Sequence, residues 1–364
     1  MMQRRTFLQG MAASGAAALS APAFASPQMT LRQKAARVLL MGFIGDNTDA
    51  DGARAVAGHL EQGRIGGVLF LRHNVRSREG VEGLTRLFRS IAPGAWMAVD
   101  QEGGAVQRLS SDLGYSPIPR AFVISEEKTV EEARALYAAA AAEFREAGFN
   151  MNLAPVADVQ DDANGVIGRW GRGYGEDGET IAAYAAAFID AFETAGAACA
   201  IKHFPGHGRS SGDSHHGFVD ITDSWSQAEL DPFRRLIDAG KAHLIMGGHL
   251  THTGLDPAGD PVTVSRPILT DLLRGQMGYQ GALITDDLDM GAIHENYAQR
   301  DAVIRSIQAG NDLIMMSNSA APDPDLPLRF ADWIEAAVAN GELTEARIDE
   351  SIARLGVLGQ RIQA

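Results

Sequence analysis

Short apolar segments alternate with longer amphipathic ones along most of this chain. Eight apolar runs recur, at residues 37–44, 65–71, 95–100, 150–157, 197–204, 243–249, 282–288 and 311–317. Several are apolar at nearly every position, which is typical of strands buried on both faces of a parallel sheet. Helix-length segments separate the runs, so the pattern predicts a single-domain (β/α)8 barrel, a TIM-type α/β fold. A doubly wound open sheet is the alternative that the same alternation allows.

The segments between the runs carry helix signals. Thr129 with Glu132 forms a capping box, and Gly148 follows as the expected C-cap of the same helix. Residues 180–195 repeat this scheme, with apolar side chains at helical spacing. Near the C-terminus we expect a proline-containing loop at residues 319–327. Two helices, at about 325–340 and about 343–362, are expected to pack on the outside of the barrel.

Polar side chains stand close to the ends of six of the runs. They are Asn74, Asp100, Gln101, Glu102, Asp158, Lys202, His203, His249 and Asp286. Active sites of (β/α)8 barrels lie at the carboxyl ends of the strands. A polar group next to buried strands costs free energy unless it is paired or used in chemistry. A ring of such groups from different strands therefore predicts an active site.

Composition narrows the class of protein. The chain has 364 residues, of which 45% are hydrophobic and 21% are charged, as in ordinary globular domains. A formal net charge of -14 and the lack of a Lys/Arg-rich stretch argue against a nucleic-acid partner. No run beyond the N-terminal segment reaches the ~18 apolar residues of a membrane span. Cys199, the only cysteine, stands in an apolar run and is expected to be a small core side chain.

The first 25 residues have the features of an export signal. Arg4 and Arg5 form a twin-arginine pattern, a weakly apolar Ala/Gly-rich stretch follows, and residues 23–25 (Ala-Phe-Ala) fit a small-x-small cleavage site. We therefore expect residues 1–25 to be a twin-arginine signal peptide that is removed on export. Residues 26–364 then form the mature domain, and its expected location is periplasmic.

Two stretches supply groups for nucleophilic and acid–base chemistry. Residues 202–208 (Lys-His-Phe-Pro-Gly-His-Gly) lead after four residues to Asp213 and His215, and Asp286 ends another apolar run. A carboxylate can act as a nucleophile, and a histidine with an unperturbed pKa of ~6.5 can carry a proton near neutrality. Cleavage of a glycosidic bond requires a nucleophile and a proton carrier of this kind.

These motifs resemble the β-N-acetylglucosaminidase (N-acetylhexosaminidase) branch of glycoside hydrolase family 3. The heptapeptide at 202–208, with the Asp-Ser-His that follows it, is the most specific part. Three further stretches agree with the family: 100–109, 152–156 and 286–288. The resemblance runs from about residue 32 to residue 318. It implies a (β/α)8 barrel, which agrees with the number of apolar runs.

The resemblance implies a role for each catalytic candidate. Asp286 matches the nucleophile of the family, which forms a covalent glycosyl-enzyme and so must be ionised. Asp213 and His215 match an acid/base dyad, in which the histidine protonates the leaving oxygen and later activates water while the aspartate orients the ring. The glycine-rich loop that carries the dyad is expected to act as a lid. Asp287 is expected to form hydrogen bonds without a catalytic role.

The resemblance also implies five sugar-binding residues: Asp100, Arg108, Arg172, Lys202 and His203. The third of these is expected in an Ile-Gly-x-Arg segment that here contains two extra residues, so Arg169 stays the alternative to Arg172. His249 and Met290 are expected at the floor of the pocket. His207 is expected to form a hydrogen bond that stabilises its loop.

The implied activity is that of a retaining exo-β-N-acetylglucosaminidase. Its expected substrates are peptidoglycan fragments or chitooligosaccharides, from which it would remove terminal non-reducing N-acetylglucosamine. We expect no cofactor and no metal, a monomeric protein, and no membrane span. The oligosaccharide substrate is the expected partner.

Four alternatives stay open. A phosphorylase on the same scaffold would use phosphate in place of water. A substrate-assisted mechanism would use the 2-acetamido group as the nucleophile. A metal-dependent hydrolase would draw its ligands from His203, His207, Asp213, His215 and His216, although residues 204–206 (Phe-Pro-Gly) prevent the helical spacing of a zinc site. A sugar-binding barrel without activity would be expected to lack a catalytic group, and the sequence contains them all.

Overall fold

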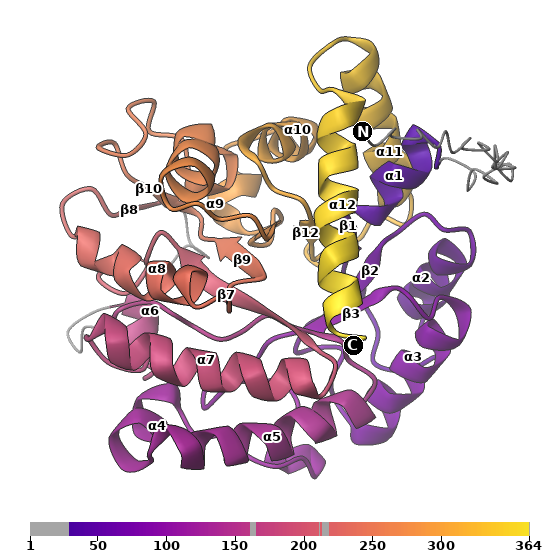
Figure 1. Ribbon diagram of the computed structural model, residues 1–364. Helices are drawn as coiled ribbons and strands as arrows, with labels where there is room; N and C mark the ends of the chain where they lie inside the picture. The colour runs from indigo at the N-terminus through magenta and orange to yellow at the C-terminus, as the bar shows by residue number, and fades with distance from the viewer. Residues whose placement is uncertain (1–28, 161–164, 211, 213–217, 364) are drawn as a thin grey trace, which may run out of the picture.

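The computed structural model describes residues 29–160, 165–210, 212 and 218–363. In this part of the chain eight strands form one parallel sheet, with one strand in each predicted run: β1 Leu39–Met41, β2 Gly67–Phe70, β3 Trp96–Val99, β6 Met151–Asn152, β7 Ala198–Phe204, β9 Leu244–Gly247, β11 Ala282–Thr285 and β12 Ile314–Met316. Their spatial order is β11-β9-β7-β6-β3-β2-β1-β12. An isolated bridge pairs Ile284 with Leu313 and closes the sheet between β11 and β12. The (β/α)8 barrel is therefore confirmed, and the open sheet is wrong (Figure 1).

Helices surround the barrel and connect its strands (Figure 1). The α-helices of the described residues are α1 Leu31–Arg37, α2 Asp51–Glu61, α3 Arg78–Ile91, α4 Ala121–Glu127, α5 Val130–Glu146, α6 Gly165–Gly168, α7 Gly178–Thr194, α8 Asp231–Asp238, α9 Gly291–His294, α10 Gln299–Ala309, α11 Leu326–Ala339 and α12 Glu345–Arg361. A π-type helix spans Pro267–Gln276. Two short strand pairs lie outside the barrel: β4 Gln101–Gly103 with β5 Val106–Gln107, and β8 Val219–Asp220 with β10 Leu250–Thr251.

Local sequence explains where the helices begin and end. Before α5 the Thr129 side chain accepts from the backbone N–H of Glu132 and the Glu132 side chain accepts from that of Thr129, as the capping box predicts. Gly148 after α5 has a φ of 94°, a conformation that glycine adopts without strain. The Asp177 side chain caps α7 and starts it slightly earlier than expected. Pro327 lies in the first turn of α11, where its missing N–H is harmless, so the predicted loop ends sooner.

The last helix, α12, differs from the prediction in its position. It was expected on the outside of the barrel, but it crosses the end at which the strands begin (Figure 1). Asp312, which is fully buried just before β12, pairs with Arg347 and Arg354 of α12 at 3.0 and 3.1 Å. These ion pairs hold α12 across the N-terminal end of the strands. Only the opposite end of the barrel is then left for a site of the kind that the sequence predicts.

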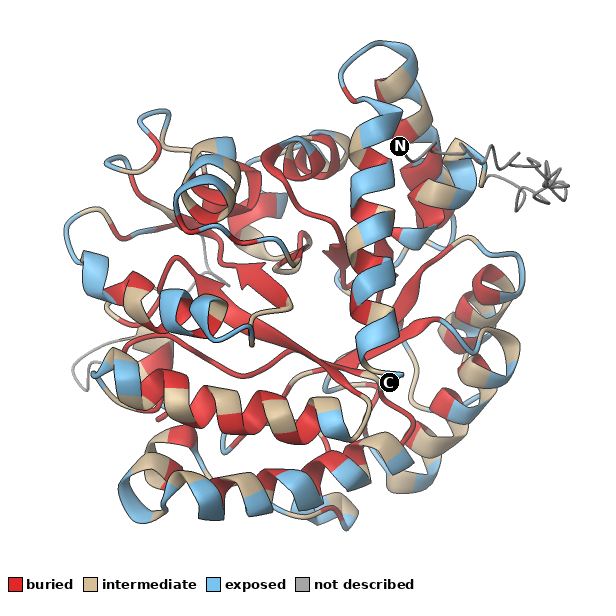
Figure 2. Ribbon diagram, viewed as in Figure 1, coloured by how far each residue is buried: buried red, intermediate tan, exposed pale blue. Residues whose placement is uncertain are grey.

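The strands and the inner faces of the helices form one continuous apolar core (Figure 2). Phe43, Phe70 and Phe149 belong to it, and Phe70 meets the other two rings edge-on at centroid distances of 5.4 and 5.0 Å. Cys199 is buried and free, as predicted. Among the described residues, no helix combines the length and the hydropathy that a membrane crossing requires.

Candidate active site

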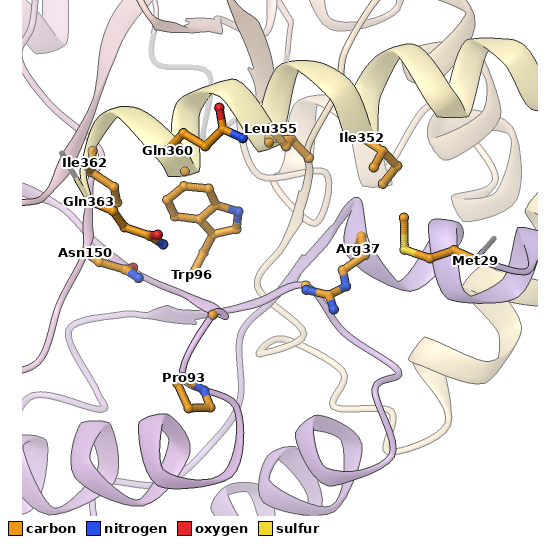
Figure 3. A pocket seen from close by; sticks show the side chains of 14 residues that line it. Met29, Arg37, Pro93, Trp96, Asn150, Ile352, Leu355, Gln360, Ile362 and Gln363 are labelled. Carbon is orange, nitrogen blue, oxygen red and sulfur yellow. The ribbon is translucent and has the colours of Figure 1, made fainter. Parts of the chain in front are cut away.

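A pocket of about 310 Å³ lies at the carboxyl ends of the strands. Its polar lining consists of Asp100, Glu102, Arg108, Arg172, Lys202, His203, His207, Asp286 and Asp287. The structure thus brings the nucleophile candidate together with all five predicted sugar-binding residues. A larger cavity of about 400 Å³ lies under α12 (Figure 3), but Arg37 is the one charged side chain among its described lining residues. We therefore place the chemistry in the smaller pocket.

Lys202 of β7 links the two carboxylates that follow β3. Its Nζ lies 2.8 Å from Asp100 Oδ1 and 2.7 Å from Glu102 Oε1. Burial alone would lower the pKa of Lys202, but the charges of Asp100 and Glu102 outweigh burial and raise it. Lys202 is therefore a fixed cation, and two of its three N–H donors are occupied by carboxylates. Neither carboxylate uses the third.

Two arginines extend this ion network. Arg172 donates to Glu102 through Nε at 2.8 Å and Nη2 at 2.7 Å, which is the planar two-bond geometry typical of Arg–carboxylate pairs. Arg108 Nη2 lies 3.5 Å from Asp100 Oδ2. Arg169, the alternative to Arg172, is exposed and stacks over Trp170 outside the pocket. The structure therefore places Arg172, and not Arg169, among the pocket residues.

Glu102 lines the pocket, although the motifs implied no role for it. Burial alone would raise its pKa, but Arg172 and Lys202 hold it far below its usual range. The preceding residue, Gln101, turns away and pairs with the backbone of Leu109 at 3.1 and 3.0 Å. Because alternate residues of an extended chain point to opposite sides, Glu102 shares its side with the aspartate two positions earlier. This alternation was the signal in the sequence that could have identified it.

Asp286 follows β11 and lines the pocket. Its Oδ1 accepts a hydrogen bond from the backbone N–H of Asp287 at 2.8 Å. Burial alone would raise the pKa of the Asp286 carboxyl, but the positive potential of His249, His203 and Lys202 and this hydrogen bond lower it below the usual value. Asp286 is therefore an ionised carboxylate, which is the state that a nucleophile requires.

The neighbouring carboxyl, Asp287, has a different environment. Its Oδ1 accepts from the backbone N–H groups of Ser317 and Asp289, at 2.8 and 3.1 Å. These bonds tie the end of β11 to the end of β12, in keeping with the structural role expected from the sequence. Burial and the charge of Asp289 raise the pKa of Asp287 to about 7. The pKa values of the two adjacent aspartates are thus shifted in opposite directions.

Asp158 is fully buried behind the pocket and holds the turn that carries two histidines. Its Oδ2 lies 2.7 Å from His203 Nδ1, and its Oδ1 accepts from the backbone N–H groups of His203 and His207 at 3.1 and 2.8 Å. His203 Nδ1 therefore donates to Asp158, and the ring lines the pocket. Burial alone would raise the pKa of Asp158, but His203 and His207 lower it.

His207 makes the loop-stabilising hydrogen bond that was expected. Its Nδ1 lies 2.5 Å from Ser210 Oγ, which in turn donates to the carbonyl oxygen of His207 at 2.8 Å. Burial lowers the pKa of His207 to about 4. The imidazole is therefore neutral near pH 7.

His249 was expected at the floor of the pocket, and this expectation is wrong. Its Nδ1 lies 2.6 Å from Thr263 Oγ1, and its Nε2 lies 2.8 Å from the carbonyl oxygen of Asp287. The ring is fully buried behind that backbone and is absent from the pocket lining. It holds the backbone next to Asp286 in place. Met290, the other residue expected there, does line the pocket.

Two catalytic candidates, Asp213 and His215, lie outside the described residues. Asn74, from the predicted ring of polar residues, is fully buried and donates to the carbonyl oxygens of Phe43 and Gly45 at 2.9 and 2.7 Å, away from the pocket. Within the described ranges, no group of three or more His, Cys, Asp or Glu side chains has the arrangement of a metal site.

The fold and the site together define the class of protein. A (β/α)8 barrel that holds an ionised carboxylate among fixed hydrogen-bonding groups, at the carboxyl ends of its strands, fits the requirements of a glycoside hydrolase. Residues 30–358 match the family model described as the glycosyl hydrolase family 3 N terminal domain. The chain therefore belongs to glycosyl hydrolase family 3, as the motifs indicated.

Individual relatives agree with this assignment. The chain is 32% identical over 351 residues to the Beta-hexosaminidase LpqI of Mycobacterium tuberculosis, and the match covers 93% of this chain and 84% of that protein. It is 30% identical over 325 residues to the Beta-hexosaminidase A of Pseudoalteromonas piscicida, with 82% of this chain but 54% of that protein covered. The chain thus spans about half the length of the second relative.

Among solved structures, the fold is similar to that of a glycoside hydrolase family 3 beta-N-acetylglucosaminidase from Paenibacillus sp. str. FPU-7. The TM-score is 0.83 at 32% sequence identity, and the match covers 93% of this chain and 64% of that chain.

Proposed function

We propose that the chain is a retaining exo-β-N-acetylglucosaminidase that releases terminal non-reducing N-acetylglucosamine from peptidoglycan fragments or chitooligosaccharides. The observation that carries the proposal is the ionised Asp286 carboxylate in a pocket with Lys202, Arg108 and Arg172. The names of the relatives support an amino sugar as the substrate. The exo mode is what the resemblance of the motifs to the family implies.

In the proposed mechanism, a carboxylate oxygen of Asp286 attacks the anomeric carbon and forms a covalent glycosyl-aspartate. The bond to the leaving oxygen breaks, and His215 donates its proton to that oxygen. His215 then takes a proton from water, whose oxygen attacks the same carbon and releases Asp286. Two displacements at one carbon retain its configuration. Asp213 is proposed to orient the imidazole and to stabilise its charged form.

The sugar-binding groups would act by position. Lys202 and Arg172 are fixed by Glu102, and His203 is fixed by Asp158. Side chains that are already held by buried partners lose little further conformational freedom when the sugar binds. The binding free energy can then be used to hold the anomeric carbon near Asp286.

A substrate panel tests the proposed activity. Muropeptides, chitobiose and simple β-glucosides would be incubated with the protein, and the products would be identified by mass spectrometry. We expect free N-acetylglucosamine from the amino-sugar substrates and no release from β-glucosides. A sugar 1-phosphate in phosphate buffer would identify a phosphorylase. Loss of turnover after dialysis against EDTA, restored by a divalent cation, would identify a metal-dependent hydrolase.

We also propose that residues 1–25 direct export and that residues 26–364 are the mature catalytic domain. Fractionation of cells that express the full chain, followed by N-terminal sequencing, tests both statements. A variant with Arg4→Lys and Arg5→Lys should stay unprocessed in the cytoplasm. Light scattering of the purified domain tests the expected monomer.

A further inference from the structure

His207 lines the pocket, and one of its ring nitrogens has no hydrogen-bond partner among the described residues. The residue is 3% exposed and is part of the pocket lining. Its Nε2 is buried and has no hydrogen-bond partner within the described structure. A buried polar atom without a partner costs free energy, so folded proteins retain few of them. A retained one at the wall of a substrate pocket points to a partner on the substrate.

The other ring nitrogen decides what Nε2 can do. Ser210 Oγ donates its only hydrogen to the carbonyl oxygen of His207 at 2.8 Å, so the same oxygen has to accept from His207 Nδ1–H, which is 2.5 Å away. The ring proton therefore stays on Nδ1, and Nε2 presents a lone pair. Burial lowers the pKa of His207 to about 4, which keeps the ring neutral at the pH of an ordinary assay.

The ring is also held in position. Asp158 Oδ1 accepts from the backbone N–H of His207 at 2.8 Å, and the rings of His203 and His207 meet edge to face at a centroid distance of 5.5 Å. A Cβ on Gly208 would lie 1.5 Å from the carbonyl oxygen of Val159, so the backbone after the ring is packed tightly against its neighbour. The acceptor is therefore pre-organised.

The cations of this pocket are paired with its carboxylates. Lys202, Arg108 and Arg172 can only donate, and the carboxylates of Asp100 and Glu102 already accept from these cations. A sugar brings hydroxyl groups, and an N-acetylhexosamine also brings an amide N–H that can only donate. Donors on the sugar need acceptors, and a neutral His207 Nε2 can serve as one beside the carboxylates.

We infer that His207 Nε2 is a specificity-determining acceptor that receives a hydrogen bond from a donor group of the bound amino sugar. The inference deepens the proposed function and rests on it, because it requires an amino sugar in this pocket. It assigns His207 a second role besides the bond to Ser210, since the ring uses one nitrogen for its loop and the other for the substrate.

Two substitutions separate these roles. His207→Asn keeps an N–H donor near the position of Nδ1, which can still bond to Ser210, and removes the acceptor. His207→Gln places an amide oxygen near the position of Nε2 and removes the donor to Ser210. A substrate-binding role predicts that the Gln variant keeps sugar recognition and the Asn variant loses it, whereas a purely structural role predicts the reverse.

The matched control is His243→Asn. His243 is a partly buried histidine outside the pocket, and burial lowers its pKa to about 4 as well. We expect this variant to change stability without changing the response to the sugar. Urea unfolding of all variants shows whether each is folded under the assay conditions.

The readout is a double-mutant cycle between His207 and the sugar. kcat/KM is measured for a 4-nitrophenyl N-acetyl-β-glucosaminide and for analogues in which one donor group is replaced by hydrogen. For one analogue, kcat/KM of the wild type should fall about tenfold relative to the parent substrate, which is the effect of one hydrogen bond. His207→Asn should have the same kcat/KM for that analogue and for the parent substrate. Equal losses in the wild type and in His207→Asn for every analogue would overturn the inference.

A failure of the proposed function would not by itself show whether His207 Nε2 accepts a hydrogen bond from the sugar. If the wild type turns over no N-acetyl-β-glucosaminide, calorimetry with N-acetylglucosamine provides the second measurement. About tenfold weaker binding to His207→Asn, with wild-type binding to His207→Gln, supports the acceptor. Equal affinity of the wild type and His207→Asn, or no binding to the wild type, overturns it.

Discussion

Glu102→Ala removes the anion that two buried cations of the pocket share. The Glu102 side chain is 5% exposed, and its carboxylate lies 2.7 Å from both Lys202 Nζ and Arg172 Nη2. In the variant, Asp100 would be the remaining carboxylate in contact with Lys202, and Arg108 already lies 3.5 Å from it. The substitution therefore leaves excess positive charge in a site with little access to water.

The size of the effect follows from this burial. Removing one partner of a buried ion pair typically costs about 3–5 kcal/mol, and we expect a loss of this size in the free energy of unfolding of Glu102→Ala. Glu102→Gln keeps an acceptor oxygen but loses the charge, so its loss should be smaller. A misplaced cationic donor is worth about 1.5–3 kcal/mol in sugar binding, which corresponds to a fall of about 10- to 150-fold in kcat/KM.

The pH dependence gives a further check on the same carboxylate. The native pKa of Glu102 lies below the ordinary value of 4.5, so its contribution to stability is fully present above that value. The contribution is lost as the pH falls through the native pKa. The difference in unfolding free energy between wild type and Glu102→Gln should therefore be constant at neutral pH and shrink under strongly acidic conditions.

Urea unfolding and steady-state kinetics measure both effects. Glu193→Gln is the matched control, because Glu193 is a largely buried carboxylate that pairs with Arg361 at 2.9 Å outside the pocket. The control should change stability and leave kcat/KM close to the wild-type value. A Glu102→Ala protein with wild-type stability and wild-type kcat/KM would show that the Glu102 carboxylate does not hold these cations in place.

Three further predictions concern other parts of the site. Because the pKa of Asp287 is raised to about 7, its protonated form stabilises the fold at low pH, and this contribution is lost as the pH rises through 7. Asp287→Asn should therefore reduce the fall in unfolding free energy between pH 5 and 8, and an unchanged pH profile would contradict this. Gly208→Ala should lower the free energy of unfolding by at least ~1–3 kcal/mol, because its Cβ would lie 1.5 Å from a backbone oxygen. In the control Gly275→Ala the nearest atom to the new Cβ is 3.5 Å away in a helix, so this variant should be neutral or stabilising. Equal unfolding curves for the two variants would argue against this packing. Arg172→Lys should lower kcat/KM about tenfold or more and Arg169→Lys should not, and the opposite order would reassign the sugar-binding arginine.

The barrel could be predicted from the sequence because each strand is buried on both faces. A continuous apolar run then marks each strand, and all eight runs contain one. The place of α12 could not be predicted in this way. Its amphipathic pattern predicts a helix with one buried face, but the ion pairs of Arg347 and Arg354 with Asp312 determine which surface of the barrel it covers. Such pairs join residues that are 35 and 42 positions apart.

The candidate site also contains residues that could be predicted from the sequence and residues that could not. Asp286, Lys202 and His203 stand in motifs at strand ends, so both their residue types and their shared location could be predicted. Alternation along the chain could have placed Glu102 on the same side as Asp100. The partners of Glu102 and Asp158 depend on which side chains turn towards these carboxylates, and a single sequence does not contain that information. His249 illustrates the opposite error, since it stands at a strand end but uses both ring nitrogens to hold neighbouring groups.

The central claim is that Asp286 becomes covalently bonded to the anomeric carbon. It is tested most directly by incubation with a 5-fluoro N-acetylglucosaminyl donor, followed by proteolysis and mass analysis of the labelled peptide. We predict one added sugar on Asp286, no label in Asp286→Asn, and normal labelling in Asp287→Asn. A label on another residue, or rapid turnover by Asp286→Asn at the wild-type rate, would contradict the account.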